Sequence, residues 1–547
     1  MQIPDINLDA ITDPAAQQGI GQLLNLIETL VAENQALRAE NRQLRDELAR
    51  LRGGSGKPDV QPPTRSTPPP DHSSEAERHI PKPRQKGRKL GLLAPTRTER
   101  CVVDSATMPP DAIRHDTTEV IVQDLILQPD IVRFVREVWL VPSTAETITA
   151  PLPDGYHGEF GPHIQALTLT LGHGANISQP SLLTFFQDAG IAIGAGTIAR
   201  WLRDHRATWV VEAQTIHQAG LASTEWQATD QTSTRVAGQN ETCHVLGNPF
   251  FTLYQTRPGG TRQDVLAVLW GQEPVFRLNA DALAWLDTTS IRSTLVTQLC
   301  AALPWDTDLS AAELPTQLDA AEVTLGPQQR QQVWDALAIA AYHAQTAVPI
   351  IRRLLSDDAA VYHLLTDAHG LCWIHDARHY TKLAPVVPAH RAVLTAFRHD
   401  YWSFYRQLVA YRAAPTGAER DRLRAGFDEL FTRRTGYLAL DERIAKTWAN
   451  QELLLLILDH PDLPLHNNDM ELAARRRVRK RDVSFGPQSR AGAQAWDTFQ
   501  TIIATATKLG VRVYAYFLGR LMAPATTPTL ADHIRERARA TICPNPA

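Results

Sequence analysis

The stretch STEWQATDQTSTRV, residues 223–236, sets the architecture of the second half of the chain. Apolar and polar residues alternate along it, which predicts a short strand with Asp230 at its end. Two runs follow, CHVLGNPFFTLYQT and DVLAVLW, and both are rich in residues that favour strands. We therefore expect three successive strands, with an acidic residue on the first.

Two later segments present further acidic residues. The apolar run that ends in SDDAAVY predicts a strand that delivers Asp357 and Asp358 to its end. The segment LHNNDMEL predicts a helix that begins near Asn467 or Asn468 and carries Glu471. Three carboxylates from two strand ends and one helix can hold two Mg²⁺ ions, because hard cations prefer oxygen ligands. Spacing alone does not show that they meet.

The whole chain predicts a multidomain α/β protein. Its 547 residues exceed what one hydrophobic core supports. The expected parts are a flexible N-terminus at 1–19, a parallel dimeric coiled coil at 20–52, a disordered linker with a basic arm at 53–89, a small β unit at 90–160, a helix-turn-helix at 161–210, the acid-bearing domain at 220–510 with helical insertions at about 274–348 and 385–460, and a C-terminal helical segment and tail at 511–547.

Residues 20–52 follow a heptad pattern. Glu occupies the later g positions and Arg the facing e positions, and Asn occupies two a positions, which favours a two-stranded parallel homodimer. The residues at the seam are Leu23, Leu30, Asn34, Leu37, Asn41, Leu44, Leu48 and Leu51, with Ile20 and Ile27 at the first a positions. The alternative is an amphipathic helix that packs on its own domain.

Three segments are candidates for DNA contact. An arm with no acidic residue can neutralise phosphates or serve only as a solubilising tail; its cations are Lys82, Arg84, Lys86, Arg88 and Lys89. Ser178 starts a helix through Ala189, and the next helix presents Thr197 and Arg200, as in a helix-turn-helix or in a generic helical hairpin. The third segment is a basic helix beside Glu471, with Arg475, Arg476, Arg477, Arg479, Lys480 and Arg481.

Residues 117–141 alternate apolar and polar side chains, which predicts two or three strands. The pair Cys372 and His375 has a spacing that zinc ligands use, but two ligands without partners favour a structural role in the core. The five Cys are scattered and no basic, apolar leader begins the chain, so we expect a reducing cytoplasmic location without a membrane span.

The segment from Leu463 to Leu521 closely resembles the C-terminal signature of transposases of the insertion-sequence 66 family. LCWIHDARHYTKL, with Cys372, His375 and Arg378, and the motif TDQT are similar to further blocks of that family. The resemblance covers most of residues 20–525.

This resemblance implies a DDE-type transposase with an RNase H-like core, and Asp230, Asp357 and Glu471 as metal ligands. Asp358 and Asp367 remain rivals for the second position. It further implies two Mg²⁺ ions replaceable by Mn²⁺, double-stranded DNA as element ends and target, and small accessory proteins as partners. The expected setting is bacterial and nucleoid-associated.

One departure concerns zinc. The family often has a four-Cys zinc unit ahead of the helix-turn-helix, whereas residues 90–160 contain Cys101 alone, with His115 and His157. We therefore expect that unit to lack zinc. The competing functions are a catalytically inactive DNA-binding regulator or relic of the same architecture, and a coiled-coil scaffold.

Overall fold

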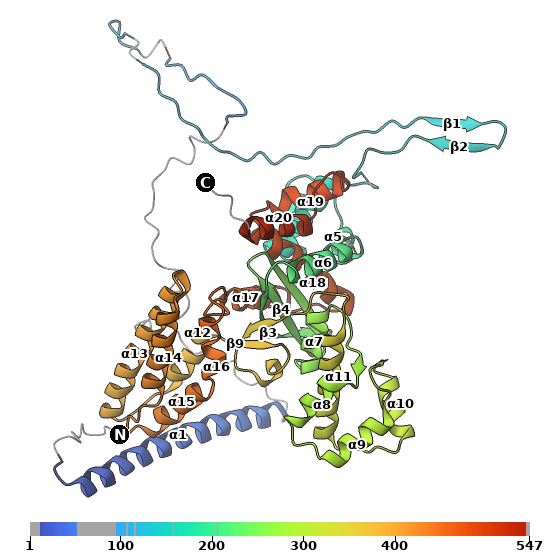
Figure 1. The fold of residues 1–547 in the computed structure, drawn as a ribbon. Coiled ribbons are helices and arrows are strands. Elements are labelled where there is room, and N and C mark those ends of the chain that lie inside the picture. Colours follow the sequence, from blue (N-terminus) through green and yellow to red (C-terminus); the bar gives the residue numbers. More distant parts are fainter. Residues whose placement is uncertain are drawn as a thin grey trace.

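The computed structural model describes residues 11–51, 94–104, 108–113, 116–156, 158–204 and 206–542. It is a mixed α/β structure around one five-stranded sheet with the strand order β5-β4-β3-β8-β9 (Figure 1). Strands β3, β4 and β5 form an antiparallel meander, whereas β8 and β9 run parallel to β3. Their bounds are Trp226–Val236, Gln239–Asn248, Phe251–Arg257, Arg353–Ser356 and Ala368–Leu371.

The three predicted strands are present, but the third does not lie where the sequence suggested. Strands β4 and β5 both come from CHVLGNPFFTLYQT, and DVLAVLW lies in helix α7 (Arg262–Trp270). Thr261 and Asp264 form a capping box at its start, and Gly271, in a left-handed conformation, ends it. These helix signals outweigh the strand preference of the Val and Leu residues between them.

Helices occupy both stretches between the acidic segments where insertions are predicted. The first stretch packs its helices beside α7, around a core shared with the sheet, and contains α8 (Ala280–Asp287), α9 (Ser293–Ala302), α10 (Glu313–Ala320), α11 (Pro327–Ala344) and the short strands β6 (Phe276–Arg277) and β7 (Asp308–Leu309). The 3₁₀ turn η5 (Ala360–Tyr362) joins β8 to β9.

The second stretch has a core of its own, built largely from aromatic side chains such as Trp373, Tyr401 and Phe427. It follows α12 (Trp373–Lys382) and contains α13 (Pro388–Ala413), α14 (Gly417–Phe431), α15 (Leu438–Ala449), α16 (Gln451–Leu454) and the 3₁₀ turn η6 (Leu456–Leu458). Helix α17 (Asn468–Ser484) then returns the chain to the sheet, where it packs on β3 and β4.

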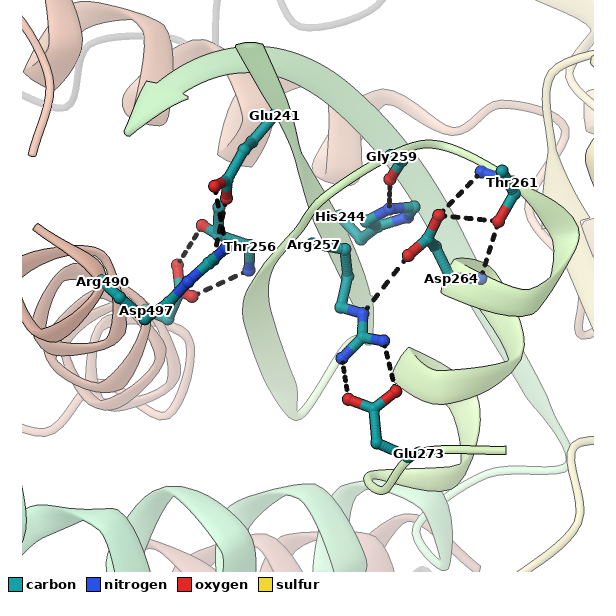
Figure 2. A network of polar contacts seen from close by, with 10 residues as sticks. All are labelled: Glu241, His244, Thr256, Arg257, Gly259, Thr261, Asp264, Glu273, Arg490 and Asp497. Carbon is teal, nitrogen blue, oxygen red and sulfur yellow. Dashed lines mark hydrogen bonds and ion pairs between the residues drawn. The ribbon is translucent and has the colours of Figure 1, made fainter. Parts of the chain in front are cut away.

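Helix α18 (Arg490–Lys508) packs along the edge strand β5. In Figure 2, the Asp497 carboxylate accepts hydrogen bonds from the Thr256 amide and hydroxyl, at 2.8 Å each, and Arg490 forms a bidentate ion pair with Glu241. On the other side of β5, Arg257 forms an ion pair with Asp264 of α7 at 3.5 Å and binds Glu273, just after α7, through two contacts of 2.6 Å. These polar contacts fix α18 and α7 to the sheet that carries the first acidic residue.

The predicted pair of helices before the sheet is present. Helix α4 (Gln179–Asp188) begins at its N-cap Ser178, which accepts a hydrogen bond from the Ser181 amide, and α5 (Ala195–Asp204) follows after a turn. The pair shares a small core that includes Phe186 and Trp201. The adjoining elements are α3 (Pro162–Leu169), the π-helical turn η4 (Thr170–Gly174), α6 (Arg206–Leu221), α19 (Val513–Met522) and α20 (Leu530–Ile542).

The expected small β unit is reduced, among the described residues of 94–156, to one hairpin of β1 (Val138–Val141) and β2 (Glu146–Thr149). The apolar residues of 117–137 are mostly exposed, with Val120 at 82% and Leu125 at 83%. Their alternation does not produce a sheet because no second layer covers them. Figure 1 shows the hairpin at the end of a long extended segment.

Helix α1 (Pro14–Leu51) spans the described part of the predicted coiled coil. Its N-terminal half lies against the second set of helical insertions (Figure 1), with Leu24 buried, while seam residues from Leu23 to Leu48 face solvent. The side chain of Leu51 and the whole basic arm lie outside the described residues. Across the described chain, no helix combines the length and apolar character that crossing a membrane requires.

Candidate active site

The sheet register aligns two of the predicted acids. Strands β3 and β8 are parallel neighbours, and Ala228 pairs with Leu355, an offset of 127 positions. The same offset relates Asp230 to Asp357, the residue that directly follows β8. Neighbouring strands lie about 4.8 Å apart, so both acids stand side by side at one end of the parallel ladder. Asp230 itself lies within β3 rather than at its end, because β3 continues to pair with β4 beyond this point.

The third acid comes from the first turn of α17. Asn467, the N-cap of α17, donates from Nδ2 to the Thr229 carbonyl at 2.5 Å, and its backbone amide donates to Cys372 Sγ at 3.3 Å. These contacts tie the start of α17 to β3 and to the residue after β9. Arg378 of α12 donates to Glu471 Oε2 at 2.6 Å and so fixes the carboxylate.

All three acids line one open pocket of about 280 Å³. Its other lining residues are Gln231, Thr232, Cys372, His375, Arg378, Asn467, Ala474, Arg475 and Val478. Residues of the three segments that the resemblance singled out, around Asp230, Cys372 and Asn467, thus surround the acids.

The surroundings of Asp230 in this pocket disfavour the ionised form of its carboxyl group. Burial raises the pKa of Asp230 to about 7, a hydrogen bond from the Gln231 amide opposes that rise, and the nearby Glu471 and Asp357 carboxylates add to it. Arg378 supplies one positive charge that stabilises the ionised form. A divalent cation among these oxygens would relieve the repulsion that remains.

Neither rival for the second acid shares this pocket's lining. Asp367 forms an ion pair with Arg352 at 2.9 Å, with its side chain about half exposed. Asp358 points instead to the imidazoles of His375 and His379, at 3.7 and 3.5 Å.

The basic cluster on α17 divides by helix face. Arg475, Arg476 and Arg479 are exposed. Arg477 and Lys480, proposed from the sequence as DNA contacts, are only 1% and 3% exposed, and this corrects that assignment. A helix with six cations in seven positions must turn some of them inward, and a buried cation needs a partner.

Those inward cations have structural contacts. Arg477 pairs with Asp497 of α18, and Lys480 donates to the Gly172 carbonyl at 2.6 Å and lies over the Trp496 ring. Arg481, half-buried, donates to the Ser233 carbonyl of β3 at 2.8 Å. All three anchor α17 to its surroundings.

Two more predicted DNA contacts lie on α5, where Arg200 is exposed and Thr197 is half-buried. Cys372 and His375 do not form a pair of metal ligands. The Cys372 thiol is buried, and its sulfur accepts a hydrogen bond from the Asn467 backbone amide. The sequence reasoning missed His379, although its spacing of four from His375 places both imidazoles on one face of α12.

Fold and pocket together define a mixed α/β protein with a three-carboxylate site at the end of the parallel β3–β8 ladder. Among curated proteins, the "Uncharacterized protein y4jO" of Sinorhizobium fredii is 30% identical over 311 residues, which make up 55% of this chain and 94% of y4jO. The chain therefore belongs to the family of y4jO. No family model and no solved structure matches it.

Proposed function

We propose that this protein is a DDE-type DNA transposase, which hydrolyses the 3′ ends of a mobile element and joins them to target DNA. The observation that carries the proposal is the arrival of Asp230, Asp357 and Glu471 in one pocket from β3, the end of β8 and the first turn of α17. The sheet supports it, since three antiparallel strands followed by two parallel ones agree with the RNase H-like core that the resemblance implies.

The residues of the pocket fit divalent metal ions. Asp230, Asp357 and Glu471 offer only oxygen ligands. Burial is the main cause that raises the pKa of Asp230, and the Glu471 and Asp357 carboxylates raise it further. These three residues would hold the Mg²⁺ ions. When bound, such ions activate the attacking oxygen and stabilise the leaving oxygen of an in-line phosphoryl transfer.

The chain's own residues prepare the site for this task. Arg378 orients the Glu471 carboxylate, and Asn467 holds the start of α17 against β3, so the third acid keeps its position relative to the sheet. Arg475 stands at 3.8 Å from Glu471 on the same helix and faces the pocket. Its guanidinium is suited to bind a DNA phosphate next to the acids.

Other exposed cations would help to position DNA. Arg476 and Arg479 lie beyond Arg475 on α17, and Arg200 lies on α5. Cations that contact phosphates set affinity and register but not sequence preference. The second helix of the α4–α5 pair is the element that would read base edges in a major groove.

The test measures cleavage of duplex DNA that carries the sequences flanking the gene, in Mg²⁺, Mn²⁺ or EDTA. We expect metal-dependent nicking at a defined 3′ end, and Asp230→Asn to reduce its rate by about 1000-fold, because correctly held ions contribute several kcal/mol. The matched control is Asp367→Asn, which changes the exposed partner of Arg352 and should retain the rate.

A different result would favour the inactive regulator. In that case the wild-type protein would bind the same DNA with an affinity that falls steeply with salt, yet no divalent ion would support nicking. A protein that neither binds nor cleaves DNA would support only the function of a coiled-coil scaffold.

A further inference from the structure

A second group of metal-ligating side chains lies beside the carboxylate pocket. Asp358 follows Asp357 directly after β8, and His375 and His379 stand one turn apart on α12. One ligand atom from each of the three lies within 4.8 Å of the other two. The two imidazoles are partly buried, with side-chain exposures of 29% for His375 and 28% for His379, whereas Asp358 is exposed at 38%.

The distances fit ligands of one ion better than they fit hydrogen bonds. His375 Nε2 lies 3.7 Å from Asp358 Oδ1, and His379 Nε2 lies 3.5 Å from Oδ2, so each carboxylate oxygen faces one imidazole. A hydrogen bond would bring these atoms to about 2.7–3.2 Å. Two ligands of a tetrahedral zinc ion, each about 2.0–2.1 Å from the metal, are about 3.4 Å apart.

The state of His379 agrees with metal binding. Its Nε2 is buried and makes no hydrogen bond within the described chain.

We propose that Asp358, His375 and His379 form a zinc site beside the Mg²⁺ site of the proposed transposase. The two sites share no ligand, although His375 also lines the carboxylate pocket. Two imidazoles and one carboxylate suit a borderline ion such as Zn²⁺, whereas Mg²⁺ prefers oxygen ligands alone. Three protein ligands leave a fourth position for water. The zinc site is unrelated to the four-Cys unit that residues 90–160 lack.

Its place in the fold gives the zinc ion a positioning role. Asp358 adjoins Asp357, and His379 adjoins Arg378, the partner of Glu471. A zinc ion would therefore join the segment after β8 to α12 and hold two acids of the pocket in a fixed relation. The residues contact the metal and not the DNA, so their effect on cleavage would be indirect.

The experiment uses the full chain after treatment with a chelator, with Co²⁺ as a spectroscopic probe and Zn²⁺ in competition. We expect one equivalent of Co²⁺ to give the visible absorption of tetrahedral Co²⁺, displaced by Zn²⁺ and not by excess Mg²⁺. His379→Gln should weaken binding by at least about 100-fold, since even outer-sphere partners of metal ligands account for 10–100-fold.

Two variants serve as controls. His399→Gln changes an exposed histidine that lies 3.6 Å from Asp400 without a second imidazole, and it should bind Co²⁺ like the wild type. Asp230→Asn should also keep the absorption, which separates this site from the carboxylate pocket. Circular dichroism would show that His379→Gln is folded.

The zinc proposal is overturned if the wild-type chain gives no such absorption, or if His379→Gln binds as tightly as the wild type. The three residues would then form only His–Asp ion pairs. Metal binding is measured without DNA. The test of the zinc site therefore stays valid even if the protein is not a transposase.

Discussion

Asp230 combines a partly buried position with two carboxylate neighbours, and its protonation should be visible in the stability of the protein. Its pKa of about 7 in the folded state lies above its ordinary value of 3.8, so the folded chain holds a proton that the unfolded chain releases. Stability from this group is complete below about pH 4 and is lost as the pH rises through about 7.

We therefore expect Asp230→Asn to stabilise the metal-free protein in alkaline solution. The gain in the free energy of unfolding should be on the order of 2 kcal/mol at about pH 8, allowing for partial exposure, and should vanish toward about pH 4. Urea denaturation in EDTA at several pH values measures it. Asp367→Asn, an exposed change, should give no such trend. An Asp230→Asn variant less stable than the wild type at every pH would contradict a destabilising charge here.

The choice of the middle acid shows what the sequence can and cannot provide. The apolar run before Asp357 predicts a strand end, and this is where β8 ends. Pairing between β3 and β8 depends on contacts across more than a hundred residues, so the match of Asp357 with Asp230 was not readable from local patterns.

At the scale of the element, α1 supplies hydrogen bonds to helices that cannot cap themselves. The Glu28 carboxylate accepts from the Val386 and Val387 amides, at 2.8–3.0 Å, where α13 begins without a side-chain cap. Asn25 accepts from the Leu438 amide at 2.9 Å and donates to the Gly436 carbonyl, at the start of α15. Helix α1 is thus fastened by polar contacts to two helix N-termini.

Loss of the Glu28 carboxylate should release this contact. We expect Glu28→Ala to lower the free energy of unfolding by about 1–2 kcal/mol, as loss of an N-cap does, and to speed hydrogen exchange at Val386 and Val387. Glu40→Ala, on an exposed part of the same helix, is the matched control. Equal exchange in both variants would mean that α1 does not hold this helix start.

Local sequence signals predict a helix start correctly where a capping residue alone determines it. The cap at Ser178 and the helix start near Asn467 appear as predicted. The prediction of a strand for DVLAVLW is wrong, because the capping box of Thr261 and Asp264 and the left-handed Gly271 make this run a helix despite its strand-prone residues. The sequence also contains an indication that α1 packs on its own chain. Leu24 and Val31 are apolar at e positions, whereas the later e positions of the same helix hold Arg.

For the whole molecule, the question is whether the docked helix α1 still leaves its seam free for a second copy. The docked residues Leu24, Asn25 and Glu28 occupy positions e, f and b, which are centred on a different side of the helix from the a/d seam. The d residue Leu37 is 61% exposed. One face can therefore bind the helical insertion while the other pairs with the partner's helix.

We expect the chain to be a homodimer in solution and the double variant Leu37→Glu/Leu44→Glu to be a monomer, as measured by light scattering after gel filtration. Each buried Leu contributes about 1.5–3 kcal/mol, and a charge at the seam removes it. Ala39→Glu, at an outward f position, should remain dimeric. If the dimer serves to hold two element ends, the monomeric variant will still nick a single end in Mg²⁺ but will not form a complex with two. A double variant that stays dimeric would place the interface elsewhere, and α1 would then be only a brace for the helices on which it lies.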